Sequence, residues 1–124
     1  MQGLNSVHLI GFLGTDCEMR FTPNGTACTT LRVAVSDNRI GDDGNKIEKT
    51  EWFTIITFNK LAETCNQYLS KGDRVFVEGR FQTRSWDGQD GQKHWKTEVI
   101  ASKVIFLEKK EELSKTNDTE VSND

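Results

Sequence analysis

Four short segments of the chain place an aromatic residue beside hydroxyl or cationic side chains. They read TEWF (50–53), TFNK (57–60), TRSW (83–86) and KHWK (93–96). Aromatic rings stack on nucleic-acid bases, and neighbouring Lys and Arg side chains neutralise phosphates. The composition of these segments therefore predicts a surface that binds single-stranded nucleic acid by stacking.

One ring from each segment is a candidate platform for a base: Trp52, Phe58, Trp86 and Trp95. Trp86 is the most informative of them, because it opens the polar stretch 86–92, which reads as a hairpin loop where a core residue is not expected. An alternative interpretation places the other three rings in the core or at a protein interface. The sequence leaves that alternative open.

Residues with the spacing of a catalytic or metal-binding site are scarce. The two histidines, His8 and His94, lie far apart in the sequence, and the three cysteines form no CxxC pair. No HExxH, GxSxG or Walker motif is present. We therefore predict that the protein is not an enzyme and uses no cofactor or metal. We interpret Cys17, Cys28 and Cys65 as reduced thiols.

The polar stretch 37–49 leaves one catalytic alternative open. Its carboxylates Asp37, Asp42 and Asp43 are candidate metal ligands for a small nuclease. A solvated, mobile flap fits the composition of this stretch better, because acidic residues next to glycines repel phosphate rather than hold it.

The elements expected to position the rings are mostly strands. Helical spacing of apolar residues predicts one helix over 59–69, with Asn59 as its cap, while Gly11 marks a bend or bulge and 23–25 a turn. Five strands with a helix between the third and fourth form the layout of the OB-fold, an all-β Greek-key barrel. The expected strands are 6–14, 27–35, 50–58, 74–84 and 95–107.

Charge is unevenly distributed along the 124 residues. The formal net charge of -3, taken alone, argues against a polyanionic partner. Residues 1–107 hold 13 of the 16 Lys and Arg residues and 13 of the 19 Asp and Glu residues, so the acidic excess lies in 108–124. We predict a domain over 1–107 and a disordered acidic tail over 108–124, whose carboxylates compete with phosphates for the binding surface.

The sequence also favours a cytoplasmic protein with no membrane partner. No apolar run approaches the roughly 18 residues that a membrane span needs, and the first residues lack the pattern of a secretory signal.

Over nearly all of 1–107 the chain resembles the bacterial-type single-stranded DNA-binding proteins. The matching motifs occur in the family's order: NSVHLIGFLGTD (5–16), PNG (23–25), TEW (50–52), FNKLAE (58–63), KGDRVFVEG (71–79), TRSW (83–86) and TEV (97–99). The resemblance implies an OB-fold homotetramer that binds single-stranded DNA without sequence preference and protects it during replication, recombination and repair. It also implies association with the nucleoid.

The resemblance assigns roles by position. Trp52, Phe58 and Trp86 match rings that stack on bases, and Trp95 lies where the family often carries another aromatic residue. Two sets of cationic residues follow from it. Arg20, Lys60, Lys71 and Arg84 match phosphate contacts, and Arg39, Lys49, Lys93 and Lys96 are candidates for additional DNA contacts.

Four features depart from the family pattern. Cys17 replaces a common proline, Phe53 replaces a frequent histidine near the tetramer contact, and Arg39 lies in a stretch where some members carry a further tryptophan. The family's acidic tip, which ends in phenylalanine and recruits replication and repair proteins, has no counterpart in 120–124. Either recruitment works differently here or the tip has been lost. The alternative function is an accessory OB-fold module for DNA or RNA in a primosome or RNA-processing complex.

Overall fold

Six strands and one helix form residues 2–109, the part of the chain that this computed structural model describes. The elements are β1 (Val7–Leu13), β2 (Glu18–Phe21), β3 (Ala27–Ile40), β4 (Lys46–Phe58), α1 (Asn59–Tyr68), β5 (Arg74–Asp87) and β6 (Lys93–Glu108). The bonded order is β1-β5-β6-β4-β3-β2, and β1 also pairs with β3, so five strands close into a barrel. The prediction of an all-β OB-fold barrel is confirmed.

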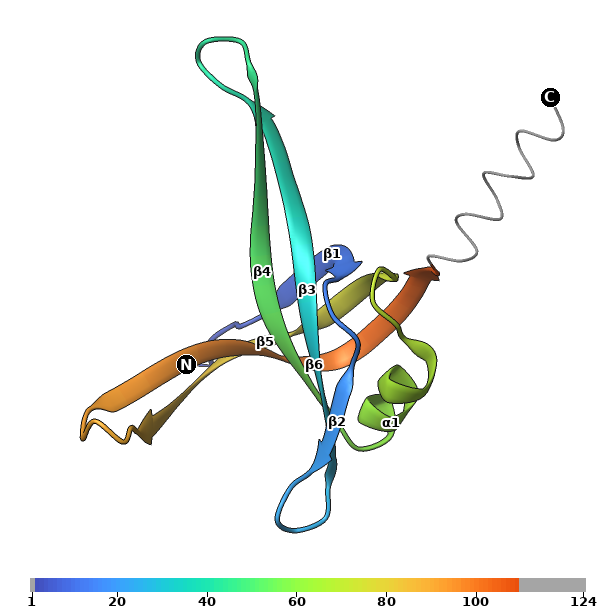
Figure 1. Cartoon of the computed structure of the whole chain (residues 1–124), viewed down its shortest axis with the longest axis vertical. Helices are drawn as coiled ribbons and strands as arrows, with labels where there is room; N and C mark the ends of the chain where they lie inside the picture. The colour runs from blue at the N-terminus through green and yellow to red at the C-terminus, as the bar shows by residue number, and fades with distance from the viewer. Residues whose placement is uncertain (1, 110–124) are drawn as a thin grey trace, which may run out of the picture.

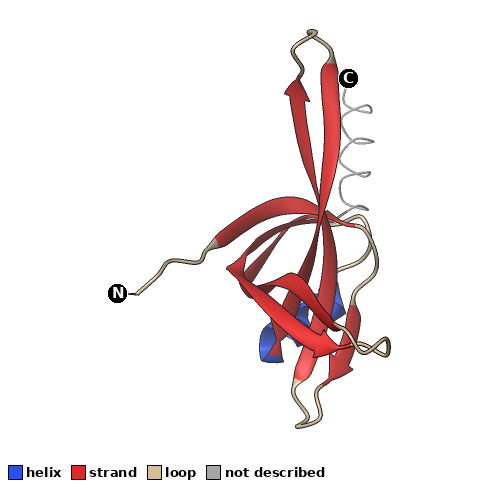
Figure 2. Ribbon diagram, turned by 90° about the vertical axis from the view of Figure 1, so that its left-hand side faces the viewer, coloured by secondary structure: helices blue, strands red, loops and turns tan. Residues whose placement is uncertain are grey.

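Two long hairpins project from the barrel, and α1 packs against one end of it (Figures 1 and 2). We call them the β3–β4 arm (36–50) and the β5–β6 arm (82–97). The short strand β2, which the sequence reading missed, pairs only with β3. Residues 110–124, most of the predicted tail, lie outside the described residues. No helix within 2–109 has the length and apolar character to cross a membrane.

The core is formed by alternate side chains of the barrel strands, because successive residues of a strand point to opposite faces. Its most deeply buried members are Leu31, Val33, Ile55, Val75, Val77 and Val99. Two buried hydroxyls bond inside this core, and the first of them ties α1 to β3. Thr29 donates to the Ala62 carbonyl at 2.7 Å, and Thr57 donates to the Thr29 carbonyl at 2.8 Å, so neither buried group lacks a partner.

Gly11 was predicted to mark a bend or a bulge, and the structure shows no bulge there but a close approach of strands. β1 pairs with β5 without a break from Val7 to Phe12, and the irregularities of the β5–β6 ladder lie next to Arg74 and Gly79. A Cβ atom on Gly11 would lie 2.3 Å from the Ala34 carbonyl oxygen. Glycine is therefore required where β1 turns from β5 to β3.

The predicted mobile flap over 37–49 is wrong. The ladder between β3 and β4 continues from Asp37 opposite Lys49 to Ile40 opposite Lys46, and only 41–45 form a turn. Asp43 accepts the Asn45 backbone N–H at 3.0 Å, and Gly44 supplies a φ of 82°. Hydrogen bonding between the strands orders this segment although its side chains are polar.

Three predicted element ends also need correction. Trp86 belongs to β5 and the turn is confined to 88–92, so β6 begins at Lys93 instead of Trp95. The helix ends at Tyr68. Its cap position is Phe58, without a side-chain cap bond, and Asn59 has a φ of 59°, which asparagine adopts more readily than most residues.

Candidate nucleic-acid interface

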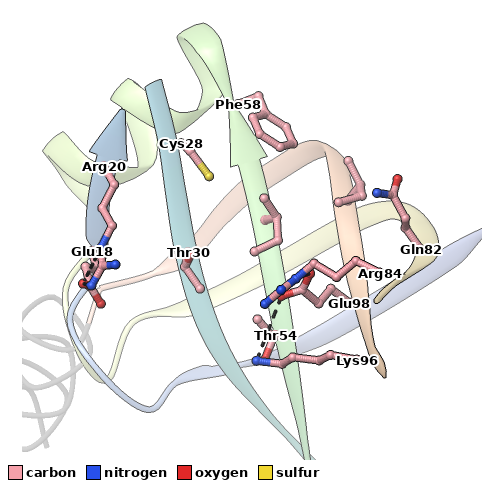
Figure 3. A pocket seen from close by; sticks show the side chains of 12 residues that line it. Glu18, Arg20, Cys28, Thr30, Thr54, Phe58, Gln82, Arg84, Lys96 and Glu98 are labelled. Carbon is pink, nitrogen blue, oxygen red and sulfur yellow. Dashed lines mark hydrogen bonds and ion pairs between the residues drawn. The ribbon is translucent and has the colours of Figure 1, made fainter. Parts of the chain in front are cut away.

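One continuous surface runs across β2, β3, β4, β6 and β5. Ile56 lies beside Ile100 in the parallel β4–β6 pair, which joins the outward faces of the two hairpins. The side chains on this surface line a hollow of about 440 Å³ (Figure 3). They are Glu18, Arg20, Cys28, Thr30, Thr54, Ile56, Phe58, Gln82, Arg84, Lys96, Glu98 and Ile100. We call these residues, with Trp52 and Trp86 two positions further along β4 and β5, the front face.

Trp52 extends the front face where β4 enters its arm. It pairs with Ala34, and the Arg32 guanidinium carbon lies 5.8 Å from its ring centroid. The ring also lies close to Gly14, where a Cβ atom would be 2.3 Å from ring atom Cζ3. The ring is half exposed, so part of it is accessible to a base.

Phe58 closes the other end of the front face, opposite Cys28 in the β3–β4 ladder. Nearby, Arg20 donates from Nε to Glu18 Oε1 at 2.8 Å, so its charge is shared with a carboxylate (Figure 3). Burial, and then the Glu98 charge, raises the pKa of the Cys28 thiol. This end therefore presents an accessible ring, a partly neutralised cation and an uncharged thiol.

Trp86 contacts two neighbours on the β5–β6 arm. The Arg84 guanidinium carbon lies 4.8 Å from its ring centroid, and the His94 ring stacks on it at 5.8 Å with a 25° interplanar angle. His94 Nε2 lies 3.1 Å from Asp90 Oδ1 in the turn. The ring is still 42% exposed, so it is oriented by its neighbours and accessible to a ligand.

Glu98 lies at the floor of the front face with its side chain only 8% exposed. Its Oε1 accepts from Arg84 Nε at 2.8 Å, and its Oε2 lies 4.0 Å from Lys96 Nζ (Figure 3). Two of the predicted DNA-contacting cations, Arg84 and Lys96, thus share one carboxylate.

Lys60 and Lys71 lie beyond the hollow. Lys60 is in the first turn of α1, next to Phe58, and lines a second hollow with Phe21. Lys71 is exposed in the turn after the helix, and its backbone N–H donates to Asp16 Oδ1 at 2.8 Å. Neither is therefore part of the front face.

The arms carry the remaining predicted cations. Lys49 Nζ forms an ion pair with Glu51 Oε1 at 3.1 Å, and Arg39 is exposed near the tip of the β3–β4 arm. Lys93 begins β6 opposite Asp87. The structure thus distributes these residues along the arms and does not bring them to the hollow.

Trp95 projects from the side of the β5–β6 arm opposite to Trp86. It pairs with Ser85, one position away from the Trp86–His94 pair, and neighbouring positions alternate between the two faces. The side chain is 65% exposed. A strand that follows the front face must pass around the arm to reach this ring.

The sequence reading missed three residues that shape this surface: Arg32, His94 and Glu98. Each acts on a ring or cation from a different strand, so local spacing gave no signal for it. Arg32 alternates along 27–35 with the apolar residues Leu31 and Val33, which predicts that its side chain faces away from the core. Its contact with Trp52 depends on the register of β3 with β4, which that pattern does not contain.

One of the three carboxylates of the nuclease alternative, Asp43, has a structural role. Two hydrogen bonds from Asn45 lower the pKa of Asp43 and hold the turn of the arm. Over 2–109, no three His, Cys, Asp or Glu side chains gather in an arrangement suited to a metal ion.

A five-stranded Greek-key barrel with aromatic and cationic side chains on one face defines the class of OB-fold proteins that bind nucleic acid. Residues 4–107 match the model of the single-strand binding protein family. The chain belongs to this family.

Similar proteins include two curated relatives and two solved structures. The chain is 42% identical to single-stranded DNA-binding protein 1 of Chlorobaculum tepidum, over 98% of this chain and 75% of that one. It is 40% identical to single-stranded DNA-binding protein 1 of Xylella fastidiosa, over 93% and 85%.

Both solved structures share the fold. A deletion mutant of the single-stranded DNA binding protein from Thermus aquaticus superimposes with a TM-score of 0.77 at 34% identity, covering 89% of this chain and 53% of that one. A Plasmodium falciparum SSB complex with ssDNA gives 0.80 at 29% identity, covering 87% and 98%.

Proposed function

We propose that this protein binds single-stranded DNA along the front face, without sequence preference, and protects it during replication, recombination and repair. The observation that carries the proposal is that Trp52, Phe58 and Trp86 share one surface with Arg20, Arg84 and Lys96. Rings accept any base by stacking, while cations attract the phosphates that every nucleotide carries, so neither interaction reads sequence.

Residues beyond the front face extend the path in this proposal. Lys60 continues the path past Phe58. Lys71 lies in the turn that is bonded to Asp16, two residues after Gly14, which contacts the Trp52 ring. Arg39, Lys49, Lys93 and Trp95 contact DNA that leaves the hollow along or around the arms.

Tryptophan fluorescence tests the proposal directly. Oligo-dT should quench the emission at low salt, and added salt should reverse the quenching. Trp95→Phe keeps both front-face tryptophans and should retain most of the quenching, whereas Trp52→Phe with Trp86→Phe should lose most of it. Absent or salt-insensitive quenching of the wild type would contradict the proposal.

The same protein offers a surface for self-association, and we propose a homotetramer. Ile10, Phe76 and Ile105 are neighbours across β1, β5 and β6 on the outside of the barrel, and Phe12 is exposed beside them. Ile10, Phe12 and Ile105 are exposed and Phe76 between them is half-buried, and an apolar patch of this kind is typical of a face that another copy covers.

The proposed function places the protein at the nucleoid in the cytoplasm, with replication and repair proteins as further partners. An accessory module for RNA is the alternative, and competition between DNA and RNA oligomers of equal length separates the two, because our proposal requires DNA to win or tie. Incubating labelled DNA with magnesium or manganese tests for a nuclease. Cleavage abolished by Asp42→Ala would overturn the assignment as a non-enzyme.

A further inference from the structure

Glu98 places a nearly buried carboxylate in the middle of a surface that should attract phosphates. Its side chain is 8% exposed, whereas the Arg84 and Lys96 side chains remain 52% and 41% exposed. A negative charge at this point repels the ligand that the surrounding cations attract. Its position therefore needs a physical reason other than direct contact with DNA.

A continuous series of contacts leads from Glu98 to the Trp86 ring. Glu98 Oε1 accepts from Arg84 Nε at 2.8 Å, and the guanidinium carbon of Arg84 lies 4.8 Å from the Trp86 ring centroid. His94 stacks against the same ring. The four residues lie on the same face of the β5–β6 ladder, Arg84 and Trp86 on β5 and His94 and Glu98 on β6, so the ladder fixes their spacing.

Two opposite effects on DNA binding follow from these contacts. A charge-assisted hydrogen bond fixes the orientation of the guanidinium, and a fixed guanidinium over the ring limits the positions that Trp86 can take. Because the same carboxylate also lies near Lys96 Nζ, both cations are partly neutralised before DNA arrives. A cation whose charge is shared with a carboxylate neutralises a phosphate less completely, so fewer counterions are released from the DNA.

We propose that Glu98 is a positioning residue for single-stranded DNA binding. It holds Arg84 against Trp86, so that the ring is already oriented for a base, and its charge weakens the attraction of the front face for phosphates. This inference rests on the proposed function. It predicts that Glu98 lowers the dependence of binding on salt while it strengthens the part of binding that salt does not screen.

Glu98→Gln tests the charge while keeping the shape and a hydrogen-bond acceptor. A plot of log affinity for oligo-dT against log salt should steepen by about 0.7 for each cation released from the carboxylate, with tighter binding than wild type at low salt. Glu108→Gln is the matched control. Glu108 accepts from Arg74 at 3.2 Å on the same two strands, outside the front face, so its removal changes the net charge equally.

Glu98→Ala tests positioning, because it also removes the acceptor for Arg84. At about 1 M salt, where charges are screened within about 3 Å, this variant should bind roughly fivefold more weakly than wild type, as expected for one poorly placed base stack. Glu98→Gln should lose less under the same conditions. Circular dichroism of both variants checks that the barrel is folded.

Cys28 provides a readout that does not involve DNA. Because the Glu98 charge contributes to the raised pKa of this thiol, Glu98→Gln should increase the rate of Cys28 alkylation at fixed pH, and Glu108→Gln should not. Equal salt slopes for the wild type and both glutamine variants, or a wild-type affinity of Glu98→Ala at high salt, would overturn the inference. A wild type that fails to bind would instead refute the proposed function.

Discussion

Trp86 and Trp95 point to opposite sides of the β5–β6 arm, because Trp86 pairs with His94 and Trp95 pairs with Ser85 at the next position of the ladder. Only Trp86 lies on the side that continues into the hollow through Arg84 and Lys96. The two rings are thus unequal candidates for base stacking, although the sequence presents both beside cations.

Trp86→Ala should weaken the binding of a short oligo-dT by about 1–3 kcal/mol, the value of one base stack. Trp95→Ala should cost less than about 1 kcal/mol with the same oligomer, because a short strand can occupy the front face without passing around the arm. Fluorescence anisotropy of labelled DNA measures both affinities. Equal losses would show that the strand wraps the arm even at short length.

Gly14→Ala should separate stability from binding. The added Cβ would meet the outer edge of the Trp52 ring at 2.3 Å, and a half-exposed ring can move away, so we expect less than about 1 kcal/mol change in the free energy of unfolding. Binding should weaken by about 1 kcal/mol, because the ring loses its position for a base.

Urea unfolding and DNA titration of the same variant check this prediction. Gly3→Ala is the control, because nothing lies within 4 Å of a Cβ there. Gly11→Ala should behave oppositely and destabilise the fold, by about 1–3 kcal/mol, since its Cβ meets the Ala34 backbone, which cannot move aside. An unchanged DNA affinity of Gly14→Ala would show that the contact of Gly14 with the Trp52 ring has no role in binding.

Two thiols, Cys65 in α1 and Cys17 packed against the end of this helix, predict a loss of stability at alkaline pH. Burial raises the pKa of Cys17 to about 11 and that of Cys65 to about 12, from the ordinary value of 9.0 for a thiol. Between these values the folded chain holds more protons than the unfolded chain, so the free energy of unfolding falls as pH rises from about 9.

Urea unfolding at pH 7, 9 and 10 measures this fall. Replacing Cys17 and Cys65 together by alanine should reduce the slope above pH 9, whereas Cys28→Ala should leave most of it. An unchanged slope in the double variant would assign the alkaline loss to other groups.

Ile10→Asp should reduce the mass measured by light scattering, because it places a charge in the exposed apolar face of β1, β5 and β6. Ile40→Asp, on the β3–β4 arm, serves as the control for an equal change in charge and apolar area. A monomeric wild type would refute the proposed tetramer. A mass unaffected by Ile10→Asp would place the contact elsewhere.

Removal of residues 110–124 should tighten DNA binding at low salt. The segment is acidic in sequence, and its carboxylates compete with phosphates for Arg and Lys side chains. The difference should disappear as salt rises. Equal affinities at low salt would contradict this competition.

The sequence alone predicts a contact when both of its residues lie in one short segment. Arg84 and Trp86 lie two positions apart on one strand, so their pairing was readable from TRSW alone. Alternation with a buried face likewise predicted the barrel part of β3, and β-branched and aromatic residues predicted that of β4. The contacts of Glu98 with Arg84 and of Arg32 with Trp52 depend on register between strands, which no single segment encodes.

The β3–β4 arm escaped prediction for a different reason. Both of its faces are exposed, so its residues show no apolar alternation, and the period of two that marks a strand is lost. The glycine and aspartate residues of its turn then made the whole stretch look like a loop. Strand β2 was too short, at four residues, to show any period.

The β3–β4 arm also exposes a strand edge to which a strand of another molecule could add. Over 46–53, β4 is bonded to β3 on one side, and its other edge carries backbone N–H and C=O groups open to a further strand. Charges occupy this edge densely, as the pairs Lys46–Glu48 and Lys49–Glu51, and charged side chains discourage edge-to-edge addition. These four charged residues therefore oppose the addition of a strand from another molecule. Replacing them with threonine or valine would leave an uncharged edge strand on which other chains could add to form fibrils.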